Sequence, residues 1–229
     1  FLGVPGYLLG RTLGLPRMTA LLAAAPLGMA VICLMGQVLC LAKVPATPVM
    51  MVGLPSALLL VAALLRNRFV HALLDGVPAV HPALVALFLV AGVVAGYVFL
   101  AGILPSPNAF HQDYDSVHHI NSIRAMMDSL SMSPLDGSSY STESDALVAV
   151  QPTGYYPSGW HVLCATVALA TNVSVTSTIN AVNLALMAMV YPLSMLFLLS
   201  TVFPGRTRVV ALGAVAALTL TIFPWGICN

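Results

Sequence analysis

The sequence predicts an all-α integral membrane protein with about five transmembrane helices and further helices at the outer membrane surface. Hydrophobic residues make up 59% of the chain and charged residues 7%, whereas ordinary soluble domains contain roughly 25% charged residues. The apolar residues form stretches of about 17–25 residues, the length that crosses roughly 30 Å of hydrocarbon. The ionisable residues are instead concentrated in residues 105–161, which contain six of the seven acidic residues and four of the six histidines.

We expect residues 1–229 to form a single transmembrane domain and to be a fragment of a longer chain. The sequence begins at Phe1 and ends directly after an apolar stretch. The four cysteines lie in apolar surroundings without CxxC spacing, so we interpret them as core residues rather than metal ligands. The net charge of +1 gives no indication of nucleic-acid binding, and no nucleic-acid partner is expected.

Residues 1–17 precede the first apolar stretch and are interpreted as a membrane-proximal connector, because they contain two prolines and several glycines together with Arg11 and Arg17. In the third apolar stretch, Gly92 and Gly96 form a GxxxG pattern, which permits close contact between helices. The five predicted spans cover residues 19–41, 46–65, 83–104, 178–201 and 209–225.

The basic residues indicate the orientation of the spans, because cytoplasmic loops carry an excess of Lys and Arg. If the first span runs from inside to outside, only Lys43 and Arg124 lie outside, and the loop of residues 105–177 lies on the extracytoplasmic side of the plasma membrane. A competing topology makes residues 155–171 a sixth span, but it divides the basic residues four against four, and the segment is short for a crossing. The six cytoplasmic residues in the preferred topology are Arg11, Arg17, Arg66, Arg68, Arg206 and Arg208.

The loop of residues 105–177 contains two predicted helices. Apolar residues at steps of three and four predict an amphipathic helix over residues 116–130 along the membrane interface, with Asp115 as its N-cap. Residues 133–154 are rich in Ser, Asp, Thr, Pro and Gly and are expected to be irregular. Tyr155 then opens a short apolar helix with the aromatic residues typical of a bilayer interface. The apolar face of the first helix consists of Val117, Ile120, Ile123, Met127 and Leu130.

Two loop motifs, Asp-x-x-x-His-x-Asn and Tyr-Tyr-Pro-x-x-Trp-His, resemble those of a family of polytopic membrane proteins of actinobacteria that is similar to the GT-C glycosyltransferases. The resemblance implies a GT-C-like fold and transfer of a sugar from a polyprenyl-phosphate donor to a cell-envelope glycan or glycolipid. The chain departs from many GT-C enzymes because three spans precede its loop, where those enzymes have one. The motif residues are Asp115, His119, Asn121, Tyr155, Tyr156, Pro157, Trp160 and His161.

Under this resemblance, Asp113, Asp115 and His119 are the candidate catalytic residues. Glycosyl transfer needs a base for the proton of the acceptor hydroxyl, and a carboxylate can serve. The Asp-x-Asp pair can also hold a divalent cation, Mg or Mn, through oxygen ligands. His119 follows Asp115 by four residues and lies on the same helical face, so it can face the acceptor or the donor phosphate. The structural alternative is that Asp115 only caps the helix and Asp113 is solvated.

The remaining candidate residues concern substrate binding. Arg124 can pair with a lipid phosphate or with Asp128, four residues on. His111, Asp115 and His119 share the spacing of a zinc site, but the Pro-rich segment before them disfavours one continuous helix. His118 is expected to point elsewhere. The candidate substrate-binding residues are Asn121, Arg124, Tyr155, Tyr156, Trp160 and His161, of which the Tyr and Trp residues are alternatively anchors at the membrane interface.

Two other classes of function fit the composition. A transporter or flippase for envelope lipids would use the acidic loop to gate or bind cations. It would be favoured by ionisable residues within the spans, and the predicted spans essentially lack them. A non-catalytic membrane scaffold would use the loop as a protein-binding surface, without a common cavity for Asp113, Asp115 and His119. Each of the three classes makes membrane lipid a partner.

Overall fold

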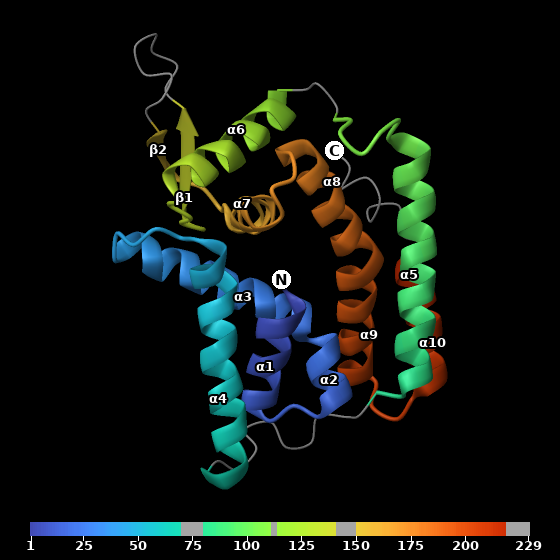
Figure 1. Ribbon diagram of the computed structural model, residues 1–229. Helices are drawn as coiled ribbons and strands as arrows, with labels where there is room; N and C mark the ends of the chain where they lie inside the picture. The colour runs from blue at the N-terminus through green and yellow to red at the C-terminus, as the bar shows by residue number, and fades with distance from the viewer. Residues whose placement is uncertain (70–79, 111–113, 141–149, 219–229) are drawn as a thin grey trace. The chain divides into compact units, whose positions relative to one another are not determined.

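The computed structural model describes residues 1–69, 80–110, 114–140 and 150–218 (Figure 1). The chain divides into two compact units, each of which is discontinuous in sequence. Unit 1 comprises Phe1, Met29–Ala57 and Ser106–Asn180, and unit 2 comprises Leu2–Gly28, Leu58–Pro105 and Ala181–Asn229.

Helices make up most of the described residues, in agreement with the predicted class. The described strands are one antiparallel pair, β1 (Asp136–Tyr140) and β2 (Val150–Tyr155). Two π-helical turns, η1 (Val49–Gly53) and η2 (Leu186–Val190), continue directly into the α-helices that follow them. The α-helices are α1 (Gly3–Leu13), α2 (Arg17–Leu22), α3 (Ala24–Leu41), α4 (Leu54–Phe69), α5 (Pro82–Ile103), α6 (Tyr114–Ser129), α7 (Gly159–Thr171), α8 (Val175–Ala185), α9 (Tyr191–Val202) and α10 (Thr207–Leu218).

A helix lies in each of the five predicted spans, the last of them described as far as Leu218. By length and composition, two helical stretches among the described residues can cross a membrane: α3, and the continuous stretch Val175–Val202 formed by α8, η2 and α9. Shorter apolar stretches in the same part of the chain are Val49–Leu65, Pro82–Val98 and Gly159–Thr171. The predicted segments are therefore helical where they are described, and two helical stretches have the length and composition of transmembrane helices, whereas five membrane spans stay a prediction.

In unit 2, α5 packs against η2 and α9 (Figure 1). A Cβ on Gly92 would overlap the carbonyl oxygen of Ala188, and a Cβ on Gly96 would lie 3.0 Å from the Ala188 Cβ. The GxxxG pattern therefore makes the close helix contact predicted from it. The apolar core of this unit contains Leu22, Val80, Val85, Phe88, Leu196 and Val210.

Most of the predicted connector at the start of the chain is instead helix α1. Pro5 lies near its start, where a helix tolerates proline because the first N–H groups have no partner within the helix. Gly6 does not interrupt α1, since a Cβ there would overlap the backbone of Ala24. Gly6 therefore allows α1 to pack closely against the start of α3. The helix ends at Gly14, whose φ of 99° is left-handed and whose N–H bonds to the Arg11 carbonyl, as is common at helix C-termini.

In unit 1, α6 packs against α7 and strand β1 (Figure 1). The predicted helix in this segment is confirmed, but it begins at Tyr114, so Asp115 lies in its first turn and not at the N-cap. Packing of α6 against α7 and β1 buries Ile123 of the predicted apolar face, and contact of that face with lipid stays a prediction. Val117 is 49% exposed, whereas the buried residues of α6 are Ser122, Ile123, Ala125 and Met126.

Strands β1 and β2 replace part of the irregular segment that composition predicts for residues 133–154. Asp136 pairs with Tyr155, and Tyr140 pairs with Val150, with an irregular register between Asp136 and Ser138. Gly, Pro and Asp are depleted in strands, so local propensity does not indicate this pairing. Packing of β1 against α6 supplies a tertiary contact that composition does not reveal.

Candidate functional site

Five ring-bearing side chains gather in unit 1 from both ends of the polar loop. His118 and His119 lie on α6, Tyr156 follows β2, and Trp160 and His161 lie in the first turn of α7. The ring centroids of His119 and His161 are 4.9 Å apart, and the Trp160 ring lies 5.6 Å from His119 and 5.1 Å from His161. The Tyr156 ring lies 5.5 Å from His118 and 5.6 Å from His161. We call these five residues the histidine–aromatic cluster.

Hydrogen bonds to the backbone hold the turn before α7 in place. The Tyr156 N–H donates to the Leu135 carbonyl, and the Ser158 N–H donates to the Pro134 carbonyl, both at 2.8 Å. Ser158 is the buried N-cap residue of α7, and its hydroxyl donates to the Tyr156 carbonyl at 3.1 Å. These bonds fix the chain just before the first turn of α7, which carries the rings that contact His119.

A hydrogen bond joins His119 to His161, with 2.8 Å between His119 Nδ1 and His161 Nε2. His161 is 3% exposed, and its Nδ1 is buried without a hydrogen-bond partner among the described residues. Because an unpaired N–H in the interior is rarer than an unpaired acceptor, we assign the His161 proton to Nε2, which then donates to His119 Nδ1. The neutral His119 ring carries its proton on Nε2, so that this nitrogen is a hydrogen-bond donor.

Both histidines of this pair have pKa values below the ordinary value of 6.5. Burial, together with smaller effects of the neighbouring His119 and His118, lowers the pKa of His161 to about 4. Burial also lowers the pKa of His119, as does His118, whereas the Asp115 carboxylate acts in the opposite direction. Both rings are therefore neutral at pH 7, a state in which each nitrogen has a defined role as donor or acceptor.

The low pKa of His161 predicts that acid destabilises the protein. Since this pKa is about 4 in the folded protein and about 6.5 in the unfolded chain, the unfolded chain binds more protons between these values. The contribution of His161 to the free energy of unfolding should be constant above about pH 6.5 and should decrease by about 2 kcal/mol from pH 7 to pH 5. Chemical denaturation at both pH values measures this difference.

His161→Gln is the matched variant for that measurement. Its amide can donate to His119 in place of Nε2, but it does not titrate in this range. The variant should therefore lose less stability than the native protein between pH 7 and pH 5. An equal loss in both proteins would contradict the low pKa of His161.

The predicted catalytic residues are only partly described. His119 lies in the cluster, and Asp115 lies four residues before it on α6, close enough for its carboxylate to act on the pKa of His119. Asp115 and Asn121 are exposed. Tyr155 is 80% exposed and makes none of the ring contacts of the cluster. Asp113 lies outside the described residues.

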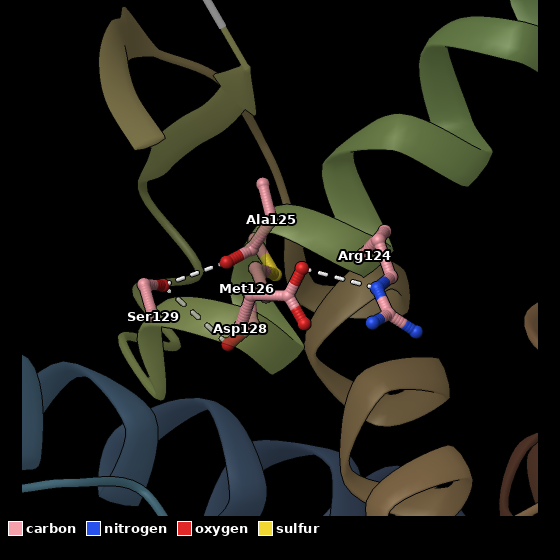
Figure 2. Close-up of polar contacts among 5 residues, drawn as sticks. All are labelled: Arg124, Ala125, Met126, Asp128 and Ser129. Carbon is pink, nitrogen blue, oxygen red and sulfur yellow. Dashed lines mark hydrogen bonds and ion pairs between the residues drawn. The ribbon is translucent and has the colours of Figure 1, made fainter. Parts of the chain in front are cut away.

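Arg124 forms an ion pair with Asp128 on the exposed side of α6. Its Nε lies 3.0 Å from Asp128 Oδ2, a contact drawn as a dashed line in Figure 2. This is the pairing weighed from the sequence as the alternative to a lipid phosphate. The neighbouring Ser129 donates its hydroxyl to the Ala125 carbonyl at 2.8 Å (Figure 2). The side chains of the ion pair are 57% and 39% exposed, and pairs of this kind contribute about 0–1 kcal/mol. A substrate-binding role for Arg124 stays a prediction.

Binding of a divalent cation by Asp113 and Asp115 also stays a prediction, because Asp113 is not described. Within the described part of the chain, no group of three or more His, Cys, Asp or Glu side chains is arranged to hold a metal ion. The three histidines of the cluster are thus not arranged as a metal site. The zinc alternative depends on His111, which lies outside the described residues.

His118 is the member of the cluster that sequence reasoning missed. Successive helical residues project about 100° apart, which predicts that His118 points away from His119. Its ring nevertheless lies 5.7 Å from that of His119, and it contacts Tyr156. The Tyr-Tyr-Pro motif marks Tyr156, but the strand pairing that precedes this residue is not evident from composition.

Fold and cluster together define a mainly helical protein in which apolar helices flank a polar segment with a histidine–aromatic cluster. The chain belongs to a family of unknown function, DUF6541, whose model matches residues 1–229. No curated protein and no solved structure matches the chain. The family match therefore includes every predicted span and both helices that contribute to the cluster.

Proposed function

We propose that this protein is an integral membrane glycosyltransferase, which transfers a sugar from a polyprenyl-phosphate donor to a cell-envelope glycan or glycolipid on the extracytoplasmic side. The observation that carries the proposal is the hydrogen-bonded pair of His119 and His161, with Asp115 one turn before His119 on α6. Transfer from a phosphate donor needs a base for the acceptor and a donor of hydrogen bonds to the phosphate. The resemblance of the loop motifs to those of GT-C enzymes supports this reaction.

Exposed apolar surface supports the membrane part of the proposal. In the two long apolar stretches, 33% and 28% of the most apolar segment is buried, whereas the core helix of a soluble protein is mostly buried. Leu34 and Leu41 on α3 are 66% and 74% exposed, and Leu58 and Leu64 on α4 are 61% and 64% exposed. Apolar surface of this extent requires a covering, and we propose that lipid provides it. The proposed spans remain residues 19–41, 46–65, 83–104, 178–201 and 209–225.

The proposed topology predicts which positions a membrane-impermeant thiol reagent can reach in intact cells. In a background without native cysteines, Ser139→Cys should be labelled from outside, whereas Arg66→Cys and Arg206→Cys should be labelled only after the membrane is permeabilised. The expected orientation follows from the excess of Arg in the loops assigned to the cytoplasm. Labelling of Arg206→Cys in intact cells would contradict five spans and favour a sixth over residues 155–171.

In the proposed reaction, the acceptor hydroxyl attacks the anomeric carbon of the donor sugar. A bond forms between the acceptor oxygen and this carbon, and the bond from the carbon to the phosphate oxygen breaks, so that polyprenyl phosphate leaves with the bonding electrons. Asp115 accepts the acceptor proton as general base. His119 donates a hydrogen bond from Nε2 to the departing phosphate, whose negative charge increases during the step. His161 is a positioning residue, because it acts through His119.

The other predicted residues bind substrate in this proposal. Tyr156 and Trp160 lie beside the histidine pair, where their rings can pack against a sugar. Asn121, Arg124 and Tyr155 are exposed, and in this proposal they bind the sugar or the lipid phosphate. A divalent cation, Mg or Mn, bound by Asp113 and Asp115 would neutralise phosphate charge, and none of the steps above depends on it.

Reconstitution of the full-length protein in liposomes tests the proposed activity. Radiolabelled polyprenyl-phosphate sugars are supplied with an envelope extract as acceptor, and the label in the acceptor is measured. Incorporation of the label that depends on Asp115 would support the proposal. Movement of the labelled lipid across the bilayer without transfer would contradict it and favour a flippase. If neither occurred with any sugar tested, a scaffold would be favoured.

A further inference from the structure

In unit 1, one face of α3 contacts the segments that carry the histidine–aromatic cluster. Cys33 is followed three and four residues later by Gly36 and Gln37, so the three residues lie on the same side of the helix. In the sequence of α3, Gln37 is the only side chain with an amide or a charge. The proposed function assigns no role to it.

The two smaller residues of this face bring α3 close to the rest of unit 1. A Cβ on Gly36 would overlap the carbonyl oxygen of Met132, so the two backbones approach closely at this point. A Cβ on Gly159, the first residue of α7, would lie 3.0 Å from Cys33 Sγ. The same face of α3 therefore meets both the segment before β1 and the start of α7.

Gln37 forms a hydrogen bond with the turn of residues 133–136. Its Oε1 accepts from the hydroxyl of Ser133 at 2.9 Å, and Ser133 is 3% exposed. The Ser133 hydroxyl also lies 3.0 Å from Asp136 Oδ2 and accepts from the N–H groups of Leu135 and Asp136 at 3.2 and 3.1 Å. Ser133 therefore closes the turn on itself and links it to α3.

The same turn determines where α7 begins. The Pro134 and Leu135 carbonyls accept from the N–H groups of Ser158 and Tyr156, and the Ser158 hydroxyl lies 3.4 Å from the Asp136 carbonyl. Ser158 is the N-cap residue of α7. A displacement of the turn would consequently displace the first turn of α7 and the two rings on it that contact His119.

We propose that Gln37 is a positioning residue, which holds the first turn of α7 against His119 by fixing Ser133 and its turn to α3. The inference rests on the proposed function, because the first turn of α7 carries His161, which orients His119 for sugar transfer. An amide on an apolar helix is costly to bury without a hydrogen-bond partner, and Ser133 supplies that partner. Gln37 has no assigned contact with substrate.

Gln37→Met removes the acceptor and retains the length of the side chain. The Ser133 hydroxyl has one proton for two acceptors, so in this variant it still donates to Asp136, and the turn keeps its own hydrogen bonds. The fold should therefore remain, while the hydrogen bond between the turn and α3 is lost. Leu34→Met introduces the same residue at a position of α3 that is 66% exposed, and it is the matched control.

Fluorescence of Trp160 measures the position of the first turn of α7 without any sugar transfer. Trp225, the other tryptophan of the sequence, is replaced by Phe in full-length protein in liposomes, so that Trp160 alone emits. The Trp160 ring lies 5.1 Å from that of His161, and release of the turn should expose it to water. Gln37→Met should therefore shift the emission to longer wavelength and increase its quenching by acrylamide, whereas Leu34→Met should do neither.

The transfer assay measures the consequence for the reaction. Gln37→Met should lower kcat about tenfold with little change in KM, because misplacement of catalytic groups by about 1 Å costs up to about 10²-fold. A loss of stability alone would lower the yield of folded protein but would leave kcat of the folded fraction and the emission unchanged. In Ser133→Ala, which already lacks the hydrogen bond to α3, Gln37→Met should have no further effect on either quantity.

These measurements separate the positioning role from the proposed function. If the emission or the kcat of Gln37→Met equalled that of Leu34→Met, the proposal would be overturned. An undiminished effect of Gln37→Met in the Ser133→Ala protein would overturn it as well. If the native protein transferred no sugar, the proposed function would fail, and the emission of Trp160 would decide whether Gln37 positions the cluster.

Discussion

Replacing Asp115 by Asn should lower the rate of sugar transfer by about 10²-fold or more, while the protein remains folded. The amide retains the size of the carboxylate but cannot accept the proton of the acceptor hydroxyl, and loss of a general base has an effect of about 10²–10⁴-fold. Asp115 is exposed in the first turn of α6, so the substitution creates no cavity and leaves no buried polar group. The decrease should therefore appear in turnover and not in the yield of folded protein.

Asp128→Asn is the matched control, because it makes the same chemical change on the same helix. Its carboxylate is engaged in the exposed ion pair with Arg124, so its loss should cost about 0–1 kcal/mol of stability and should change the rate far less. The transfer assay with full-length protein in liposomes measures both variants. If Asp115→Asn formed product at the native rate, Asp115 would not be the base, and its role would be electrostatic stabilisation of the α6 N-terminus.

The sequence predicts the helices of this protein well, because their signals are local. An apolar stretch of about 20 residues specifies a helix through composition alone, and α5 follows its predicted bounds to within one residue at each end. GxxxG spacing likewise indicates the contact of Gly92 with Ala188. Local signals fail where tertiary packing determines the role of a residue. The glycines near the start of the chain predict a flexible connector, but in α1 they allow the close approach of α3.

The candidate site is less predictable, because it depends on contacts between residues about 40 positions apart. The sequence marks His119 and His161 as separate candidates, but only the packing of α6 against α7 joins them in a hydrogen bond. Strands β1 and β2 place Tyr156 against His118, although their composition does not favour strands. The burial that lowers the pKa of His161 is likewise a property of the assembled unit, and no local pattern encodes it.

The second large effect is a decrease in turnover that we expect when His119 is substituted. Asn and Gln each replace one ring nitrogen of His119 and not the other, so the two variants test the roles of Nδ1 and Nε2 individually. In the assigned tautomer, Nδ1 accepts the hydrogen bond from His161 and Nε2 donates to the departing phosphate. An Asn side chain can replace Nδ1 but does not reach the position of Nε2, whereas Gln can place its amide near Nε2. His119→Asn should therefore lower turnover by about 10²–10³-fold, the effect of losing one donor to a developing negative charge.

His119→Gln should retain more turnover than His119→Asn, because the Gln amide can still donate to the phosphate. The Gln variant should be less stable, since it leaves the buried Nε2 of His161 without its partner. The expected decrease for His119→Asn lies equally in kcat and kcat/KM, as for an interaction made only in the transition state.

His118→Gln, a change in the same cluster at a residue without an assigned contact to substrate, controls for disturbance of the packing. If His119→Asn and His118→Gln reduced kcat to the same small extent, His119 would have a structural role only. If His119→Gln were instead the less active of the two His119 variants, donation of a hydrogen bond from Nε2 would not be the role of His119.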